Sequence, residues 1–542
     1  MSERRMMHRP GQRLLQLTVC SVLVISSLEI WAQPATSALA TKSTYVNPST
    51  WPGVLILQSG VVPAGNPLAE ADHKLLAAAL SNKDSQVLLA VEPETHAAVE
   101  LTSVLNGHES QVVRLSVTDW CSQLNDAGAV ATWTTCDSIW IDVSSETANA
   151  IKQLDTASHE RLKKCLDTVL SNGGFVRVSG DLGWLGLNAT NGRTVLLEHC
   201  TICTTIPEKE GSDSLLQVCI PEGARCAFAK RQVVNIAKEP AVEIKLPPTE
   251  HYTAALAKTL REGEAIDWVQ WQRARLERQL PHYPGRDRVE HALAGGSLVI
   301  GGGGGMPEEV WKRFVELAGG KNARIVILPT AVEDPKAEPA FEERVLKLAG
   351  AGQVVTLAQH QRSEVEDEAF LAELDQATGV WFGGGRQWRF VDAYWGTPAW
   401  EKLIAVCKRG GVIGGSSAGA TIQGDLLVRG APAGNHIMIA DGYRRGLGLL
   451  PGVAIDQHFS QRNRFRELEG CLADFPAICG IGIDEQTALV VASPDQCSVI
   501  GTGSVWHYPS YDANEQFKPD SQTRSKMRTE YKSGSQFSLV PQ

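Results

Sequence analysis

The chain has 542 residues with a formal net charge of −10; 43% of its residues are hydrophobic and 21% are charged. This length exceeds one ordinary domain core and indicates two or three domains. The balance of hydrophobic and charged residues is that of a globular protein and excludes disorder as its main state. The acidic charge provides no basic surface for a nucleic acid, so we expect no nucleic-acid partner.

The first forty residues have the layout of a secretory signal peptide. A positive end leads into an apolar run at residues 14–32, and small residues at Ala32 and at Ala38-Leu39-Ala40 offer cleavage sites. Polar residues interrupt the run, which makes it a poor membrane-spanning helix. The sequence therefore predicts that residues 1–40 are removed and that the protein is exported, to the periplasm or outside the cell, without membrane attachment. A retained anchor and a mis-assigned start are the alternatives.

The role of the twelve cysteines has three possible interpretations. Four of them lie close together, at Cys200, Cys203, Cys219 and Cys226. This spacing is compatible with a zinc site, with two disulfides or with buried thiols. In an exported protein we favour disulfides and predict no metal site. Cys471 and Cys479 form a second candidate pair.

Four segments of the first half resemble segments of the second half. Residues 53–60 (GVLILQSG) match 296–303 (GSLVIGGG), 86–91 match 324–329, 138–142 match 379–383, and 165–180 match 406–417. Short apolar runs that alternate with amphipathic stretches are typical of buried parallel strands joined by helices. The repetition indicates that one supersecondary pattern occurs twice.

We therefore predict an α/β fold with two consecutive doubly wound, mainly parallel-sheet domains, at about residues 45–285 and 290–542. Residues 239–286, at the end of the first domain, are predicted to be a helical connector. The alignment puts Gly180 opposite Ser417, so we interpret the first domain as a degenerate copy that serves packing, dimerisation or substrate access. A chance likeness between two α/β domains is the alternative. The polar tail after Tyr508 is expected to be partly loose.

Residues 410–424 (GGVIGGSSAGATIQG) contain a candidate nucleophile. Gly415-Ser416-Ser417-Ala418-Gly419 fits the Gly-x-Ser-x-Gly elbow, in which small neighbours allow a sharp turn that exposes the serine hydroxyl. A helix that begins there would aim backbone N–H groups at developing negative charge. A glycine-rich packing turn is the alternative.

A catalytic serine needs a base and an acid that orients the base. His458 lies among polar and charged residues in IDQHFSQRNR (455–464), a setting that is unusual for a packing histidine. Glu485 follows an apolar run in GIGIDEQTALV (480–490). Asp425, about two helical turns beyond Ser417, is the fallback acid.

Three motifs in this order, the SAGA elbow, DQHFSQRxR and GIGIDExTA, resemble the cyanophycinase branch of the serine-peptidase family that also contains aspartyl dipeptidase (peptidase E). The resemblance covers residues 296–491 and implies a class I glutamine amidotransferase-like fold. It implies Ser417 as nucleophile, His458 as general base and acid, and Glu485 as orienting acid. The amides of Gly385 and Ala418 would form the oxyanion hole. The order Ser, His, acid also differs from that of α/β-hydrolase esterases. No cofactor is implied.

The same resemblance implies a substrate pocket made of Gln387, Asp456, Gln457, Arg462 and Arg464. The planar guanidinium of arginine suits a carboxylate, and the carboxylate of Asp456 would pair with a substrate cation. The chain departs from the family pattern at two positions. Arg386 replaces the usual acid of the GGDQ turn, and Glu467 stands where a further arginine is expected. These departures concern the natural polymer substrate and leave the hydrolytic residues intact.

The sequence thus predicts an exported, metal-independent serine hydrolase that cleaves an amide next to aspartate, in a small peptide or at a polymer end, through an acyl-enzyme on Ser417. The alternatives are a peptide- or ligand-binding protein that retains the fold and a serine transacylase. The number of subunits is left open, with a homodimer as one arrangement. The five-glycine run at residues 301–305 lacks the features of a nucleotide loop and is interpreted as a flexible turn at the active-site edge.

Overall fold

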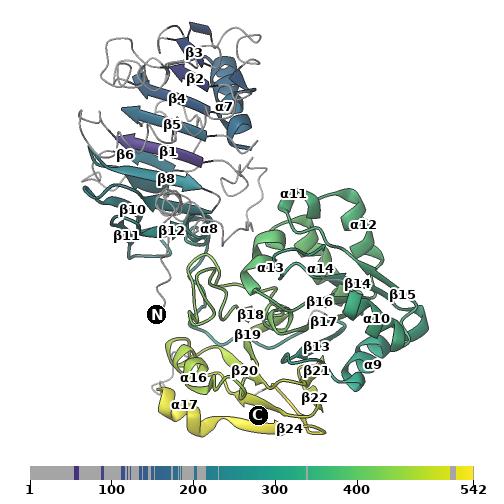
Figure 1. The fold of residues 1–542 in the computed structure, drawn as a ribbon. Coiled ribbons are helices and arrows are strands. Elements are labelled where there is room, and N and C mark those ends of the chain that lie inside the picture. The colour runs from purple at the N-terminus through teal and green to yellow at the C-terminus, as the bar shows by residue number, and fades with distance from the viewer. Residues whose placement is uncertain are drawn as a thin grey trace, which may run out of the picture. The chain divides into compact units, whose positions relative to one another are not determined.

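The computed structural model describes residues 215–540 apart from 230, 294, 337–339 and 513–519, and only parts of residues 54–203. The predicted signal peptide therefore lies outside the described residues. None of the described helices is long and apolar enough to cross a bilayer. The chain divides into two compact units (Figure 1), the first extending to Val269 and the second comprising Gln270–Gln542, with Glu250–Tyr252 counted in the second.

The first unit contains a long mixed sheet and a small sheet. Its elements are β1 (Val54–Ser59), β2 (Val87–Ala90), β3 (Val112–Leu115), β4 (Ser138–Val143), α7 (Thr156–Ser171), β5 (Phe175–Gly180), β6 (Cys200–Cys203), β7 (Leu216–Cys219), β8 (Arg225–Ala229), β9 (Gln232–Asn235), β10 (Val242–Leu246), β11 (Leu256–Leu260) and β12 (Ala265–Asp267). The long sheet has the strand order β12-β9-β8-β1-β5-β4-β2-β3 and the small sheet the order β11-β10-β7-β6. Helix α8 (Trp268–Glu277) follows, and the division between the units falls within it.

The second unit has the same two kinds of sheet. Its strands are β13 (Ser297–Gly301), β14 (Arg324–Leu328), β15 (Gln353–Thr356), β16 (Gly379–Phe382), β17 (Val412–Ser416), β18 (Gly424–Leu426), β19 (Leu450–Gln457), β20 (Cys479–Ile483), β21 (Thr487–Ser493), β22 (Gln496–Gly501), β23 (Ser504–Tyr508), β24 (Thr529–Lys532) and β25 (Gln536–Phe537). Its helices are α9 (Glu308–Leu317), the 3₁₀ turn η4 (Gly320–Asn322), α10 (Ala340–Leu348), α11 (Arg362–Val365), α12 (Glu368–Gln376), α13 (Gln387–Tyr394), α14 (Pro398–Lys408), α15 (Ala418–Thr421), α16 (Phe465–Asp474) and α17 (Ser521–Met527). The strand orders are β15-β14-β16-β17-β13-β21-β22-β25 and β18-β19-β20-β23-β24.

The two long sheets repeat one strand order. Strands β1 to β5 occupy the places that β13 to β17 occupy in the second unit, and β8, β9 and β12 occupy those of β21, β22 and β25. In both sheets the first five strands are parallel and the last three antiparallel. The strands predicted from the four matched segments are confirmed, and the fold is mixed α/β with parallel sheets.

The register of these strands agrees with the predicted equivalence of Gly180 and Ser417. Ser59 pairs with Gly180 at the end of β5, whereas Gly301 pairs with Ser416 at the end of β17, one residue before the serine. Since Gln58 aligns with Gly301 in sequence, Gly180 takes the place of Ser417. On the other side of the same strands, Gln58 pairs with Arg225 and Gly301 with Ala488. The residue three positions earlier is then a glutamate in both units, Glu222 and Glu485.

Helices cover both faces of the long sheet in the second unit. On β16, Trp381 packs against Phe314 of α9 with ring centroids 5.0 Å apart, and the next residue, Phe382, packs against Phe390 of α13 at 5.1 Å. Successive strand residues point to opposite faces, so α9 and α13 lie on opposite sides. This burial on both faces explains why these strands are continuous apolar runs in the sequence.

Three sequence expectations need correction. Residues 239–286 are not mainly helical, because β10, β11 and β12 precede α8. The tail after Tyr508 contains α17, β24 and β25, and both strands join a sheet. The candidate pair of Cys471 and Cys479 forms no disulfide, because both are free and buried, and Cys226 is free and buried as well.

Candidate active site

Ser417 occupies a strained turn between β17 and α15. Its φ of 58° and ψ of −113° lie outside the regions that ordinary residues adopt. The neighbours must be small: a Cβ added to Gly419 would lie 2.2 Å from the carbonyl oxygen of Phe382. This is the geometry of a nucleophile elbow, which lifts a serine hydroxyl clear of the sheet. The helix predicted to follow has only four residues, so local amides rather than a long helix supply its polarity.

His458 and Glu485 complete a hydrogen-bonded chain with Ser417. The Oγ atom of Ser417 is 2.9 Å from Nε2 of His458, and Nδ1 of His458 is 2.5 Å from Oε1 of Glu485. His458 follows the end of β19, and Glu485 follows the end of β20, the parallel neighbour of β19. The carboxyl ends of parallel strands meet at one edge of a sheet, which brings His458 and Glu485 together across 27 positions. Ser417, 41 positions before His458, follows β17 of the long sheet.

The electrostatic setting of His458 favours a neutral imidazole. Burial lowers its pKa below the ordinary histidine value; the hydrogen bond that it donates to Glu485 raises the pKa in part, and the nearby Arg462 guanidinium lowers it again. A neutral imidazole with Nδ1–H donated to Glu485 leaves Nε2 free to accept a proton from Ser417. The arrangement can therefore generate a serine nucleophile at neutral pH.

The adjacent carboxylates Asp484 and Glu485 point in different directions. Asp484 is buried and accepts hydrogen bonds from the amides of Ser460 and Ser504, at 3.0 and 3.2 Å. Asp484 thus joins the segment after His458 to the start of β23, and no hydrogen bond between it and the imidazole occurs among the described residues. The fallback acid Asp425 accepts from the amide of Gly452 at 2.8 Å instead. Among the three candidates, Glu485 is therefore the acid that pairs with His458.

A glycine turn after β16 lies beside the nucleophile. A Cβ added to Gly384 would lie 3.5 Å from the Cβ of Ser417. The next residue, Gly385, has a φ of 141°. No hydrogen bond donated by the amides of Gly385 or Ala418 occurs in the described part of the chain. Both amides are therefore unpaired within the described residues, at the two positions where the sequence predicts an oxyanion hole.

Two glutamines predicted to face substrate are buried with unsatisfied polar atoms. Gln387 is 1% exposed and Gln457 is 4% exposed. Within the described residues, Nε2 of Gln387 and Oε1 of Gln457 have no hydrogen-bond partner. Buried polar atoms are normally paired, because an unpaired one loses its hydration without compensation. One donor and one acceptor are therefore available to a ligand.

Asp456 and Arg464 are engaged with the protein itself rather than presented to substrate. Asp456 is fully buried, and its carboxylate binds both Arg429 and Arg464 at 2.9 Å. Arg464 also donates to the carbonyl of Gln457 at 2.7 Å. The cation that the sequence analysis expected from a substrate is thus already supplied by the chain. Sequence reasoning missed Arg429, a loop residue, because its pairing partner lies 27 residues away on β19.

The remaining predicted residues differ in exposure. Arg462 is exposed near His458, and no ion pair of its guanidinium occurs among the described residues. Arg386, which replaces the usual acid of its turn, donates to the carbonyl of Ala431 at 2.8 Å. Glu467, the other departure from the family pattern, binds Arg429 at 2.7 Å and is 45% exposed. Both departures therefore have partners within this chain.

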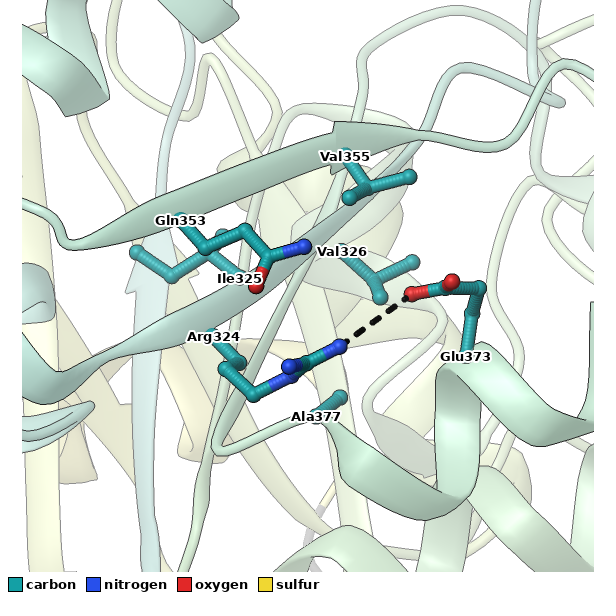
Figure 2. Close-up of a pocket in the computed structure, with 7 residues that line it drawn as sticks. All are labelled: Arg324, Ile325, Val326, Gln353, Val355, Glu373 and Ala377. Atoms are coloured by element: carbon teal, nitrogen blue, oxygen red, sulfur yellow. Dashed lines mark ion pairs between the residues drawn. The ribbon is translucent and has the colours of Figure 1, made fainter.

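A small hollow elsewhere in this unit does not belong to the site. Figure 2 shows Arg324, Gln353 and Glu373 around it, with Arg324 paired to Glu373 at 3.9 Å. Arg324 and Gln353 are the first residues of β14 and β15. The hollow thus lies at the amino ends of the parallel strands, opposite the edge that carries Ser417.

Comparison with known proteins assigns the second unit to one group. A model of peptidase family S51 matches residues 297–497, which include Ser417, His458 and Glu485. The cyanophycinase of Geminocystis herdmanii is 33% identical over 223 residues, covering 40% of this chain and 81% of that protein. The cyanophycinase of Trichormus variabilis is 34% identical over 224 residues, covering 40% of this chain and 74% of that protein.

Two solved structures also match. A peptidase from an acI-B1 actinobacterium is 23% identical with a TM-score of 0.34, covering 46% of this chain and 98% of its own. A putative peptidase E protein from Listeria monocytogenes is 16% identical with a TM-score of 0.28, covering 38% and 98%.

Proposed function

Because the chain belongs to peptidase family S51 and is a serine-type peptidase, we propose that it hydrolyses an amide bond next to aspartate, at the end of a cyanophycin chain or in an aspartyl dipeptide. The observation that carries the proposal is the hydrogen-bonded chain Ser417–His458–Glu485. The cyanophycinase relatives supply the substrate class.

The reaction follows from the site geometry. His458 Nε2 accepts the proton of Ser417 as Oγ attacks the carbonyl carbon, and Glu485 stabilises the imidazolium that forms. The amides of Gly385 and Ala418 bind the oxyanion, and each such donor is worth about 3 kcal/mol in the transition state. The imidazolium then protonates the leaving amine as the C–N bond breaks. A water molecule, deprotonated by the same imidazole, hydrolyses the acyl-enzyme and restores Ser417.

Recognition of aspartate is assigned to three side chains beside the triad. The exposed guanidinium of Arg462 is available to a substrate carboxylate, for which its planar donors are suited. The buried Gln387 and Gln457 offer one donor and one acceptor for the peptide groups next to the scissile bond. An aspartyl residue presents both kinds of group, a carboxylate and flanking amides.

We further propose that the first unit is a degenerate copy of the second, with both units doubly wound. It has the same strand order, it retains Glu222 at the place of Glu485, and it has Gly180 at the place of Ser417. Without a nucleophile it would act in packing, dimerisation or substrate access. We also propose that the protein is exported, which the signal-peptide-like composition of residues 1–40 supports.

The test is hydrolysis of β-Asp-Arg, α-Asp-Leu and cyanophycin by the wild type, by Ser417→Ala and by Ser416→Ala as the matched control. We expect cleavage that is lost in Ser417→Ala and retained in Ser416→Ala, and a serine-reactive phosphonate that labels Ser417. No turnover and no labelling of the wild type would favour a binding protein instead. Amide products formed in the presence of added amines would identify a transacylase.

A further inference from the structure

Three consecutive carbonyl groups, those of Gly301 at the end of β13 and of the next two residues, each accept a hydrogen bond from a different segment of the site. The pairs are Ser417 N to Gly301 O at 3.0 Å, His458 N to Gly302 O at 2.8 Å, and Gln486 N, next to Glu485, to Gly303 O at 2.7 Å. The nucleophile, the base and the residue after the acid are thus all fixed to one short stretch of backbone. Such bonds hold the three segments at the correct separation.

The same stretch also contacts the catalytic side chains directly. A Cβ added to Gly303 would lie 2.3 Å from Cε1 and 2.6 Å from Nε2 of His458, closer than real side chains approach. A Cβ added to Gly304 would lie 2.6 Å from Oε2 of Glu485. The backbone of the two glycines therefore lies against the imidazole and the carboxylate, in space that only glycine leaves open.

We propose that residues 301–304, here called the glycine template, position the triad: their carbonyls hold its three segments, and Gly303 fixes the imidazole of His458 between Ser417 and Glu485. The proposal rests on the proposed function, since it concerns the same serine. It replaces the flexible turn expected from sequence, because this backbone is hydrogen-bonded to Ser417, His458 and Gln486. Gly303 and Gly304 are positioning residues that act through His458 and Glu485.

The first half of the chain offers an internal comparison. Where the second half has the glycine template, the aligned residues of the first half are Gln58, Ser59, Gly60 and Val61. That half has Gly180 in place of the nucleophile. Only the position of Gly303 keeps a glycine there, Gly60, so the complete glycine run accompanies the serine whereas the glycine at position 303 by itself does not.

The test compares Gly303→Ala with Gly305→Ala in the full chain. Both glycines have positive φ, 102° and 80°, so both substitutions strain the backbone. Only at Gly303 would the new Cβ meet the imidazole, because a Cβ on Gly305 has no atom within 4 Å. For Gly303→Ala we expect kcat to fall by about 100-fold, the loss typical of a displaced catalytic group. KM should be unchanged, and Gly305→Ala should retain both constants.

The rate of phosphonate labelling, measured per folded molecule and against pH, separates positioning from a loss of folded protein. The hydrogen bond that His458 donates to Glu485 raises the pKa of His458, so an imidazole moved away from Glu485 should titrate at lower pH. Equal labelling rates and pH profiles for Gly303→Ala and Gly305→Ala would overturn the template and leave the proposed function standing. A wild type that neither labels nor hydrolyses would instead remove the proposed function.

A second variant, Gly304→Ala, tests the proposal if Gly303→Ala does not fold. Gly304→Ala places its Cβ 2.6 Å from both Cβ and Oε2 of Glu485 rather than against the imidazole, so it should displace the carboxylate and show a smaller loss of kcat with the same shift of the pH profile. If both variants fail to fold while Gly305→Ala folds, the glycines serve folding, and the template is wrong.

Discussion

The guanidinium of Arg429 binds the carboxylate of Asp456 through two nitrogen atoms, with Nε 2.9 Å from Oδ1 and Nη2 2.9 Å from Oδ2. Both side chains are buried, at 2% and 0% exposure. Asp456 lies two residues before His458, so this ion pair anchors the end of the strand that carries the base. The carboxylate of Asp456 is therefore paired within the protein and is not available to bind a substrate cation.

Breaking this pair should therefore destabilise the protein. We expect Asp456→Asn to lower the free energy of unfolding by about 3–5 kcal/mol, because two buried guanidinium groups lose their counter-charge. Urea denaturation provides the measurement. The control is Glu467→Gln, which removes a half-exposed partner of Arg429 and should cost at most about 1 kcal/mol. If Asp456→Asn instead had normal stability and a raised KM, Asp456 would be a substrate-binding residue.

The acid limb of the kcat/KM–pH profile, where activity falls as the base becomes protonated, should lie below the ordinary pKa range of histidine. The base is active when deprotonated, and burial lowers the pKa of His458, so kcat/KM should stay constant on moving from pH 7 into that range and fall only at lower pH. Arg462→Gln removes a charge that lowers this pKa and should shift the limb to higher pH. Arg466→Gln, another exposed arginine on the same segment, is the control and should leave the limb in place.

Substitutions of the neighbouring carboxylates Glu485 and Asp484 should affect different properties, activity for the first and stability for the second. Glu485→Gln should fold normally and lose about 10⁴-fold in kcat, as when the acid of a catalytic triad becomes an amide. Asp484→Asn weakens the acceptors of the Ser460 and Ser504 amides, so it should lower the free energy of unfolding by about 1–3 kcal/mol. Steady-state kinetics with parallel denaturation curves test both. If Asp484→Asn lost activity and Glu485→Gln lost stability, Asp484 would be the orienting acid and Glu485 the structural residue.

Gln387→Met should weaken substrate binding without harming the fold. The side chain is buried, and its Nε2 has no partner among the described residues, so an apolar residue of similar size removes an unsatisfied donor. We expect unchanged or slightly higher thermal stability together with a KM about tenfold higher, the loss of about one good hydrogen bond. An unchanged KM would show that Gln387 does not contact substrate.

The buried cysteines should resist both oxidation and labelling. Burial raises the pKa of Cys471 and of Cys479 to about 12, which leaves almost no thiolate at neutral pH. Mass-spectrometric mapping after treatment of the native protein with iodoacetamide should find both unmodified, and mapping after denaturation should find both modified. Detection of peptides joined by a Cys471–Cys479 disulfide would instead support the pairing predicted from the sequence.

The sequence by itself predicted four strands of the long sheet, β13, β14, β16 and β17, and the three residues of the candidate triad. Parallel strands buried on both faces must be continuous apolar runs, so β13, β16 and β17 are visible as such. The elbow at Ser417 also requires small residues next to it in sequence. These features are local, because each depends on a residue and its immediate neighbours along the chain.

Only the tertiary structure decided which polar groups are free and which are already bound. Asp456 and Gln457 are adjacent, yet the first is neutralised by Arg429, which comes from a distant loop, and the second retains an unpaired oxygen. The role of Gly303 likewise depends on the imidazole of His458, 155 positions further along the chain by their residue numbers. Ion pairs, burial and close packing depend on distances between segments that folding brings together, and no local pattern in the sequence encodes those distances.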